Sequence, residues 1–132
     1  MRKDGVARIH RAGIVLELKQ LGLELDPKYS HDWFLKRWNA NDCEIKTYKI
    51  NKKIVGFMSN VGGEIMLYVD PEYHRMGIGS SLISSDGDVW VLDGNVMAER
   101  FYSKNGFYNT GKSEEIEMFD HKVVKNLWGR YS

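Results

Sequence analysis

The sequence contains one cysteine, two prolines and no long run of apolar residues. The single cysteine, Cys43, excludes an intramolecular disulfide and a cysteine-rich structural zinc site. Without an apolar stretch of about 20 residues, a transmembrane helix is not expected. The basic N-terminal residues are not followed by a signal-like apolar segment. These absences are typical of an intracellular protein, so we expect a cytoplasmic location and no membrane partner.

The sequence has no large excess of charge of either sign, because it contains 19 Lys and Arg residues and 18 Asp and Glu residues. This balance argues against a protein held on nucleic acid mainly by phosphate contacts. The histidines lack metal-ligand spacing, so we predict no metal. A hydrophobic content of 42% over 132 residues suits one globular domain. We therefore predict a single domain over residues 1–132.

Apolar periodicity predicts helices first and antiparallel strands next. Apolar residues recur at helical spacing from about residue 6 to residue 25, with Gly22 as a helix stop, and Ser30 suits the N-cap of a second helix. Alternating residues over 44–58 predict a β-hairpin. The segment Glu64–Val69 is apolar on both faces, which is typical of a central strand covered by helices on both sides.

Short helices and strands alternate in the second half. The pattern predicts a short helix over Gly77–Ser84, a buried strand over Val89–Leu92 and a helix from Asn95 to Lys104. Three strand-like segments follow within residues 107–128, with a hairpin turn at Asp120–His121. Together these elements predict an α/β fold with a mixed, mostly antiparallel central sheet flanked by helices.

Two glycines, Gly77 and Gly79, stand where a strand gives way to a helix, in "YHRMGIGSSLI". Glycine weakens a helix by roughly 1 kcal/mol relative to alanine, so the pair needs either tight packing or close approach of a ligand. Unpaired N–H groups and the helix dipole make a helix N-terminus suitable for an anion, and Ser80 and Ser81 add hydroxyl groups. The string lacks the P-loop pattern, and Leu82 breaks the dinucleotide fingerprint. For a lone G-x-G, packing is the preferred interpretation.

The longer string "VDPEYHRMGIG" changes that interpretation. It resembles the acetyl-CoA motif of the GNAT superfamily of N-acetyltransferases, which is Arg/Gln-x-x-Gly-x-Gly/Ala after a strand that ends in Val-x-Pro. Val69, Pro71, Gly77 and Gly79 match this motif, whereas His74 replaces its first Arg or Gln.

A second string, "NVMAERFYSKNGF", is similar to a downstream pattern of the same family. The matching residues are Asn95, Ala98, Phe101, Tyr102, Lys104, Gly106 and Phe107. The resemblance covers about residues 44–107 and implies a GNAT-like acyl-CoA N-acyltransferase fold. The fold is expected to be trimmed at its N-terminus, because a helix is predicted where the family has its first strand. The helix after Gly79 also looks short for the family.

The resemblance implies acetyl-CoA as co-substrate. Main-chain amides from Arg75 to Ser80 are expected at its diphosphate, and Leu67–Val69 and Asn95 at its pantetheine arm. The expected cofactor-binding residues are Leu67, Tyr68, Val69, His74, Arg75, Met76, Gly77, Ile78, Gly79, Ser80, Asn95 and Tyr102.

The implied reaction is direct acetyl transfer to a primary amine of a small molecule or protein in a ternary complex. The amine must lose a proton, since an alkylammonium has a pKa near ~10.4, and the departing thiolate must be stabilised. The resemblance places Tyr102 as general acid and Glu64 as general base, with Asp70, His74 and a water chain as rivals for the base. Structurally, Tyr102 would otherwise be a core tyrosine with its hydroxyl at the surface, and Glu64 a solvated carboxylate.

The acceptor site is harder to read. Glu115 and Glu117 share one face of a predicted strand, where they attract a cationic amine or simply form a wet sheet surface. Two other functions stay open, namely a non-catalytic acyl-CoA-binding module and an acetyltransferase toxin acting on aminoacyl-tRNA. Pairing of the late strands between subunits leaves a homodimer open as well.

Overall fold

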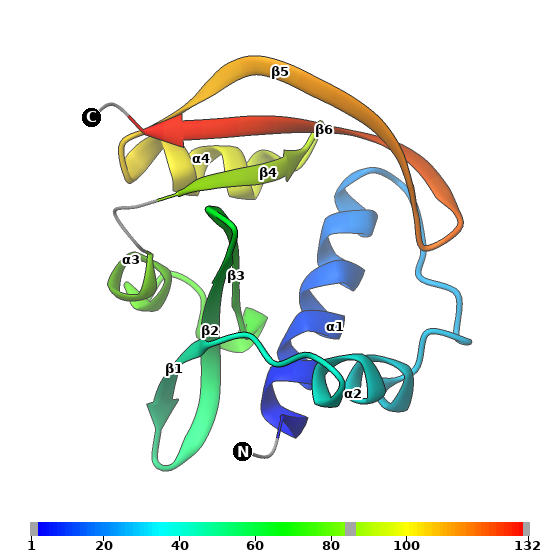
Figure 1. Cartoon of the computed structure of the whole chain (residues 1–132), viewed down its shortest axis with the longest axis vertical. Coiled ribbons are helices and arrows are strands. Elements are labelled where there is room, and N and C mark those ends of the chain that lie inside the picture. The colour runs from blue at the N-terminus through cyan, green and yellow to red at the C-terminus, as the bar shows by residue number, and fades with distance from the viewer. Residues whose placement is uncertain (1–2, 84–86, 131–132) are drawn as a thin grey trace.

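The computed structural model describes residues 3–83 and 87–130 and arranges them as a six-stranded sheet with helices on both faces (Figure 1). The helices are α1 (Asp4–Gln20), α2 (His31–Asn39), the 3-10 turn η1 (Pro71–Tyr73), α3 (Ile78–Leu82) and α4 (Val96–Lys104). The strands are β1 (Ile45–Ile50), β2 (Lys53–Val61), β3 (Glu64–Val69), β4 (Asp88–Leu92), β5 (Phe107–Met118) and β6 (His121–Arg130). Strand order is β1-β2-β3-β4-β6-β5, and only β3 and β4 pair in parallel.

This architecture confirms the predicted α/β class, with β3 in the interior of the sheet between β2 and β4. The N-caps are confirmed too, since the Ser30 hydroxyl accepts from Trp33 N and the Asn95 amide oxygen accepts from Ala98 N. Both bonds satisfy N–H groups that the first helical turn leaves without a partner.

Of three predicted boundaries, one agrees with the structure and two were wrong by small amounts. The first helix ends at Gln20, which agrees with the predicted stop at Gly22, whose φ is positive. Residues 107–118 form one strand with an irregularity between Asn109 and Ser113, and the hairpin turn lies at Phe119–Asp120. The short helix ends at Leu82, and the predicted end at Ser84 lies outside the described residues.

The two faces of the sheet have separate cores. Helices α1 and α2 cover one face, where Met66 and Tyr68 of β3 pack against the buried residues of α1. Helices α3 and α4 cover the other face, and Leu67 packs there against the cluster that contains Tyr102. Because neighbouring strand residues point to opposite faces, β3 contributes to both cores. Within the described ranges, none of the helices combines the length and apolarity that a membrane crossing needs.

The end of β3 is fastened to α1 by an ion pair. Arg8 donates to the Asp70 carboxylate at 2.7 Å and to the Ile54 carbonyl at 3.0 Å. Asp70 also accepts from Glu72 N at 3.1 Å, which caps η1. Burial by itself would raise the pKa of Asp70, but the hydrogen bonds from Arg8 and from the Glu72 amide outweigh it and lower the pKa. This contact fixes the point from which the glycine-bearing loop departs.

We expect Arg8→Met to destabilise the fold by about 1–3 kcal/mol, because it leaves the Asp70 carboxylate enclosed without its cation. Urea unfolding at neutral pH measures the change. The matched control is Lys19→Met, which removes the same charge from an exposed position on the same helix and should change stability by less than about 0.5 kcal/mol. Equal effects of the two substitutions would show that the ion pair contributes nothing.

Candidate active site

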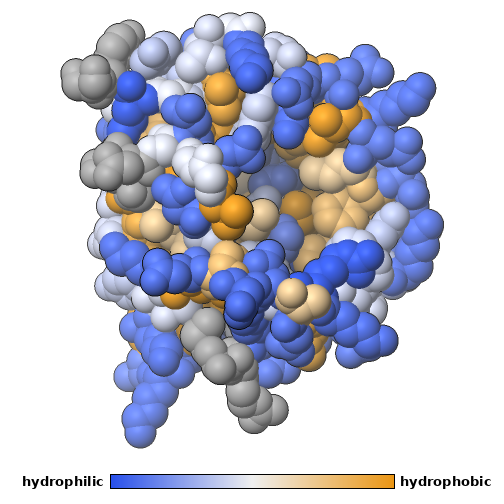
Figure 2. Space-filling view, in the orientation of Figure 1, coloured by the Kyte–Doolittle hydropathy of each residue, from blue (hydrophilic) through white to orange (hydrophobic). Residues whose placement is uncertain are grey.

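A large cavity opens where β3 and β4 diverge. The two strands pair only at Glu64 with Asp88 and at Ile65 with Val89. Beyond these pairs the cavity of about 760 Å³ lies between them and is lined from both faces of the sheet. The space-filling view is hollowed near its middle, with hydrophobic side chains beside the opening (Figure 2). A cavity of this size is typical of a small-molecule or cofactor site.

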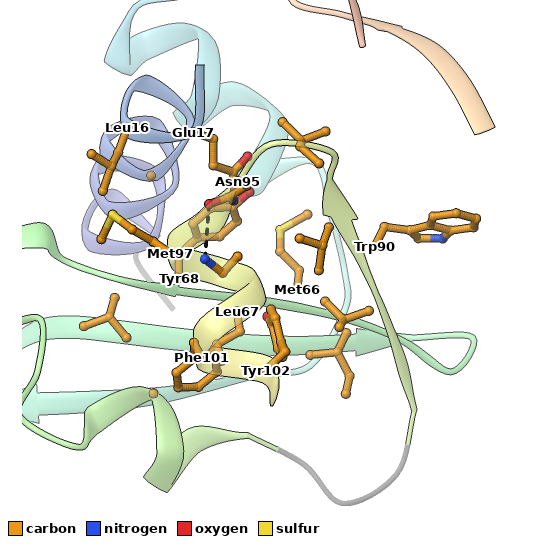
Figure 3. A pocket seen from close by; sticks show the side chains of 18 of the residues that line it. Leu16, Glu17, Met66, Leu67, Tyr68, Trp90, Asn95, Met97, Phe101 and Tyr102 are labelled. Atoms are coloured by element: carbon orange, nitrogen blue, oxygen red, sulfur yellow. Dashed lines mark hydrogen bonds between the residues drawn. The ribbon is translucent and has the colours of Figure 1, made fainter. Parts of the chain in front are cut away.

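The structure brings nearly all of the predicted site residues to this one cavity. The lining includes Leu67, Tyr68, Val69, His74, Arg75, Gly77, Ile78, Gly79, Ser80, Asn95, Tyr102 and Glu64. Met76 is not among the lining residues, and its side chain is 60% exposed. Segments distant in sequence therefore meet at a common site, as Figure 3 shows for the labelled Leu67, Asn95 and Tyr102.

The two glycines have different local roles. Gly77 has a φ of 77°, in the left-handed region, and a Cβ there would meet no atom within 4 Å. Gly79 lacks a positive φ, but its Cβ would lie 2.8 Å from Cε1 of Phe101. Gly77 thus serves the backbone turn, whereas Gly79 serves close packing of α3 on α4. The first helical hydrogen bond runs from Ser81 N to Gly77 O, so the amides of Ile78, Gly79 and Ser80 in the first turn of α3 have no intrahelical partner.

His74 holds the start of this loop to the end of β3. Its Nε2 lies 2.9 Å from the Val69 carbonyl oxygen. The side chain that replaces the first Arg or Gln of the motif is therefore engaged in a local hydrogen bond. Positive charge on this side of the cavity comes instead from Arg75 of the loop and from Arg100 and Lys104 of α4.

Asn95 joins α4 to α1. Its Oδ1 accepts from Gln20 Nε2 at 2.7 Å as well as from Ala98 N at 3.2 Å. Gln20 completes the connection by accepting from Met97 N at 3.1 Å. The amide oxygen of Asn95 is thereby committed to the protein, and the helix start that it caps is fixed against the last turn of α1.

Tyr102 is enclosed, with 6% of its surface exposed. Burial first, and the charge of Glu17 second, raise its pKa above the ordinary value for tyrosine. The hydroxyl therefore keeps its proton throughout the neutral range. The alternative interpretation, a core tyrosine with its hydroxyl at the surface, does not fit this low exposure.

Glu64 lies at the rim of the cavity. It is exposed, and its Oε1 accepts a hydrogen bond from Trp90 Nε1 at 3.2 Å. Such a carboxylate is well solvated. Glu64 is the first residue of β3, so it lies at the opposite end of the strand from Tyr68 and Val69.

Glu17 on α1 is a site residue that the sequence reasoning missed. It lines the cavity beside Tyr68, whose hydroxyl is hydrogen-bonded to its carboxyl group. Burial raises the pKa of Glu17 to about 7, against the lowering effect of that hydrogen bond. Figure 3 shows the Glu17 side chain leaving α1 toward Tyr68 and Asn95. Glu17 lies four residues after Gly13 and three before Gln20, and both of these residues line the cavity. Because residues at this spacing share one face of a helix, the spacing was the signal that could have identified Glu17.

The predicted acceptor carboxylates Glu115 and Glu117 do not line the cavity, and both are exposed. Their neighbours Ile116 and Met118 line it instead. The alternation along β5 thus presents apolar side chains inward and charges to solvent. The interpretation of Glu115 and Glu117 as a wet sheet face fits this placement.

The central strands of this mixed sheet separate over a cavity, beside a glycine-bearing turn. This arrangement is the one expected for the acyltransferases that the motifs resemble. The family described as "Acetyltransferase (GNAT) domain" matches residues 41–109. The chain belongs to this GNAT acetyltransferase family.

Relatives and solved structures agree with this assignment. The chain is 40% identical over 73 residues to the uncharacterized N-acetyltransferase YafP of Escherichia coli K12, a match that covers 52% of this chain and 47% of YafP. The fold is similar to apo-YjaB from Escherichia coli, with a TM-score of 0.67, 22% identity and coverage of 96% of this chain and 91% of that one. It is also similar to the PaiA N-acetyltransferase of Thermoplasma acidophilum in complex with coenzyme A, with a TM-score of 0.56, 17% identity and coverage of 98% and 94%.

Glu17 makes stability depend on pH with a definite sign. Its pKa is 4.5 as a free group and about 7 in the fold, so its favourable contribution is full below pH 4.5 and is lost as pH rises through 7. Glu17→Gln should therefore be more stable than the wild type above pH 7, by roughly 1–3 kcal/mol after allowance for solvent in the cavity.

Urea unfolding of both proteins between pH 5 and 8.5 measures this difference. The variant must be compared with the wild type at each pH, because His10 also makes stability depend on pH. Burial lowers the pKa of His10 to about 4, so its contribution to stability increases with pH, and it does so equally in both proteins. A difference in stability that does not grow with pH would show that Glu17 is solvated like a surface carboxylate.

Proposed function

We propose that this protein transfers the acetyl group of acetyl-CoA to a primary amine by direct attack in a ternary complex. The observation that carries the proposal is the convergence, in one cavity, of the glycine turn, the part of β3 that has no β4 partner, and Tyr102. Coenzyme A is bound in the structure of the similar PaiA protein. Family membership supports acetyl transfer, and the site geometry suggests how it proceeds.

The cofactor would lie on the α3 and α4 side of the cavity. Amides between Arg75 and Ser80 precede the first helical hydrogen bond and suit the diphosphate, with the Arg75 side chain beside them. Arg100 and Lys104 add charge along α4 for the remaining phosphate. The pantetheine amides would pair with main-chain groups of Leu67–Val69, in the manner of an added strand.

The main-chain edge of β3 and Tyr102 serve the chemical step. An N–H group of Leu67–Val69 that faces the parted edge would stabilise the oxyanion as the amine adds to the thioester. Tyr102 would then give a proton to the departing sulfur, whose thiol form is the stable one near neutral pH. Burial keeps the Tyr102 hydroxyl protonated before the step, but the raised pKa also makes it a weaker acid than a thiol. The transfer to sulfur would therefore be coupled to the return of a proton from the attacking nitrogen to the Tyr102 oxygen.

The activity is tested by measuring free CoA released from acetyl-CoA over a panel of primary amines and amine-bearing peptides, with binding of acetyl-CoA followed by calorimetry. The proposal expects saturable binding and amine-dependent release. Binding without release from any amine would favour a non-catalytic acyl-CoA-binding module and contradict the proposal.

Tyr102→Phe should lower kcat by about 100-fold while the dissociation constant of acetyl-CoA changes less than about threefold, because only the proton donor is removed. Tyr48→Phe is the matched control, since Tyr48 lies on the outer strand β1 and is 36% exposed. A Tyr102→Phe enzyme that acetylates amines at the wild-type rate would exclude Tyr102 as the acid.

A further inference from the structure

The cavity extends to the α1 face of the sheet, beyond the part assigned to acetyl-CoA. On that side Leu16, Met66, Trp90, Ile116 and Met118 form its walls, and all five are apolar or aromatic. Met66 and Met118 pack with the core of the α1 face, whereas Leu67 and Tyr102 belong to the opposite core. The parted strands connect the two sides, so a molecule on the α1 side would meet the thioester through the gap.

Glu17 is the carboxyl group set into this apolar half. Its hydrogen-bond partner is the neutral Tyr68 hydroxyl, and among the described residues no cation forms an ion pair with it. Enclosing a carboxylate without a cation is costly, and natural proteins retain such groups mainly at functional sites. An ammonium group of a ligand would supply the missing charge.

The other charged and titratable groups of the cavity are already engaged or lie elsewhere. From β6, Lys125 is 3.7 Å from Glu114 and 4.2 Å from the Trp90 ring. Glu64 of β3 accepts a hydrogen bond from Trp90 at the rim of the cavity. The remaining groups, Tyr73, His74, Arg75, Arg100, Tyr102 and Lys104, come from the loop and α4 on the cofactor side. Glu17 is thus the ionisable group placed to receive a cation in the α1 half.

The carboxyl is held in place from both directions along α1. One turn before it, Gly13 leaves room for the Tyr68 ring, since a Cβ at Gly13 would lie 2.2 Å from Cδ1 of Tyr68. One turn after Glu17, the Gln20 amide donates a hydrogen bond to Asn95 and accepts one from Met97 N. Tyr68 and α4 therefore fix the position of Glu17 relative to both halves of the cavity.

We propose that Glu17 binds the ammonium group of the acceptor and takes its proton, and that the acceptor is a primary alkylamine with an apolar body. This inference rests on the proposed acetyltransferase function and assigns to Glu17 the role of general base that the family resemblance implied for Glu64. The burial that raises the pKa of Glu17 brings it closer to that of an alkylammonium, which favours proton transfer.

The ammonium gives one proton to the Glu17 carboxylate, and the neutral amine attacks the thioester carbonyl, forming the C–N bond. As the C–S bond breaks, sulfur takes the Tyr102 proton, and the second amine proton restores Tyr102. Glu17 then releases its proton to solvent. The products are the N-alkylacetamide, CoA thiol and one proton, from an alkylammonium and acetyl-CoA.

The test compares Glu17→Gln and Glu17→Asp with the wild type, using phenylethylamine as the apolar probe and glutamate as the polar one. We expect Glu17→Gln to lower kcat/KM for phenylethylamine by about 100-fold, with acetyl-CoA affinity unchanged within threefold. The acidic limb of the wild-type pH profile, near pH 7, should vanish in Glu17→Gln and return in Glu17→Asp. The wild type should prefer phenylethylamine over glutamate by at least about tenfold.

The control is Glu44→Gln, which removes a carboxylate from an exposed position before β1 and should leave the kinetics unchanged. If the wild type turns over and Glu17→Gln keeps its rate and its acidic limb, Glu17 is not the proton acceptor, although the acetyltransferase function stands. If the wild type binds acetyl-CoA but acetylates neither probe nor any amine of the wider panel, both proposals fail together.

Discussion

The separation of β3 from β4 is the constraint on which the site depends. Strands that pair along their full length would leave no cavity and would satisfy every main-chain group at their shared edge. Here the parallel ladder ends after Ile65 and Val89, while β2 continues to hold β3 along its whole length. The sheet therefore stays intact on one side of β3 and opens on the other. A ligand in that opening can reach both faces of the sheet.

The elements around the opening are fastened by polar contacts that span long sequence distances. Arg8 and Asp70 join α1 to the end of β3, and Gln20 and Asn95 join α1 to the start of α4. Helix α1 thus acts as the frame to which both sides of the cavity are attached. A single carboxyl on that frame, Glu17, faces the gap and carries no cation of its own among the described residues. On this arrangement rests the proposal that one face of the gap receives the phosphorylated cofactor and the other the amine.

Local signals in the sequence predicted the elements on the α3 and α4 side of the cavity well. The N-cap of α4, the glycine turn and the apolar strand β3 are each determined by a few consecutive residues, and their order along the chain reproduces the motifs of the family. The sequence could also assign the sheet as mixed, because a strand–helix–strand connection follows a hairpin.

The α1 side of the cavity could not be predicted in the same way. The environment of Glu17 is made by Tyr68 and Tyr102, which lie more than 50 residues away in the sequence. A polar residue beside an apolar helical stripe is normally solvated, so its enclosure is a tertiary effect. The faces of Glu115 and Glu117 depended on the register of β5, which its irregularity after Asn109 shifts. Helical and strand periodicity alone do not resolve such details.

The central claim is that one cavity holds the cofactor at the gap between the parted strands. It is tested most directly by following backbone amide NMR signals of the labelled protein during titration with coenzyme A. We expect saturable shifts centred on Leu67–Val69 and Gly77–Ser81, with the outer strand β1 unaffected. Saturable shifts confined to other parts of the chain, or no shifts at all, would contradict it.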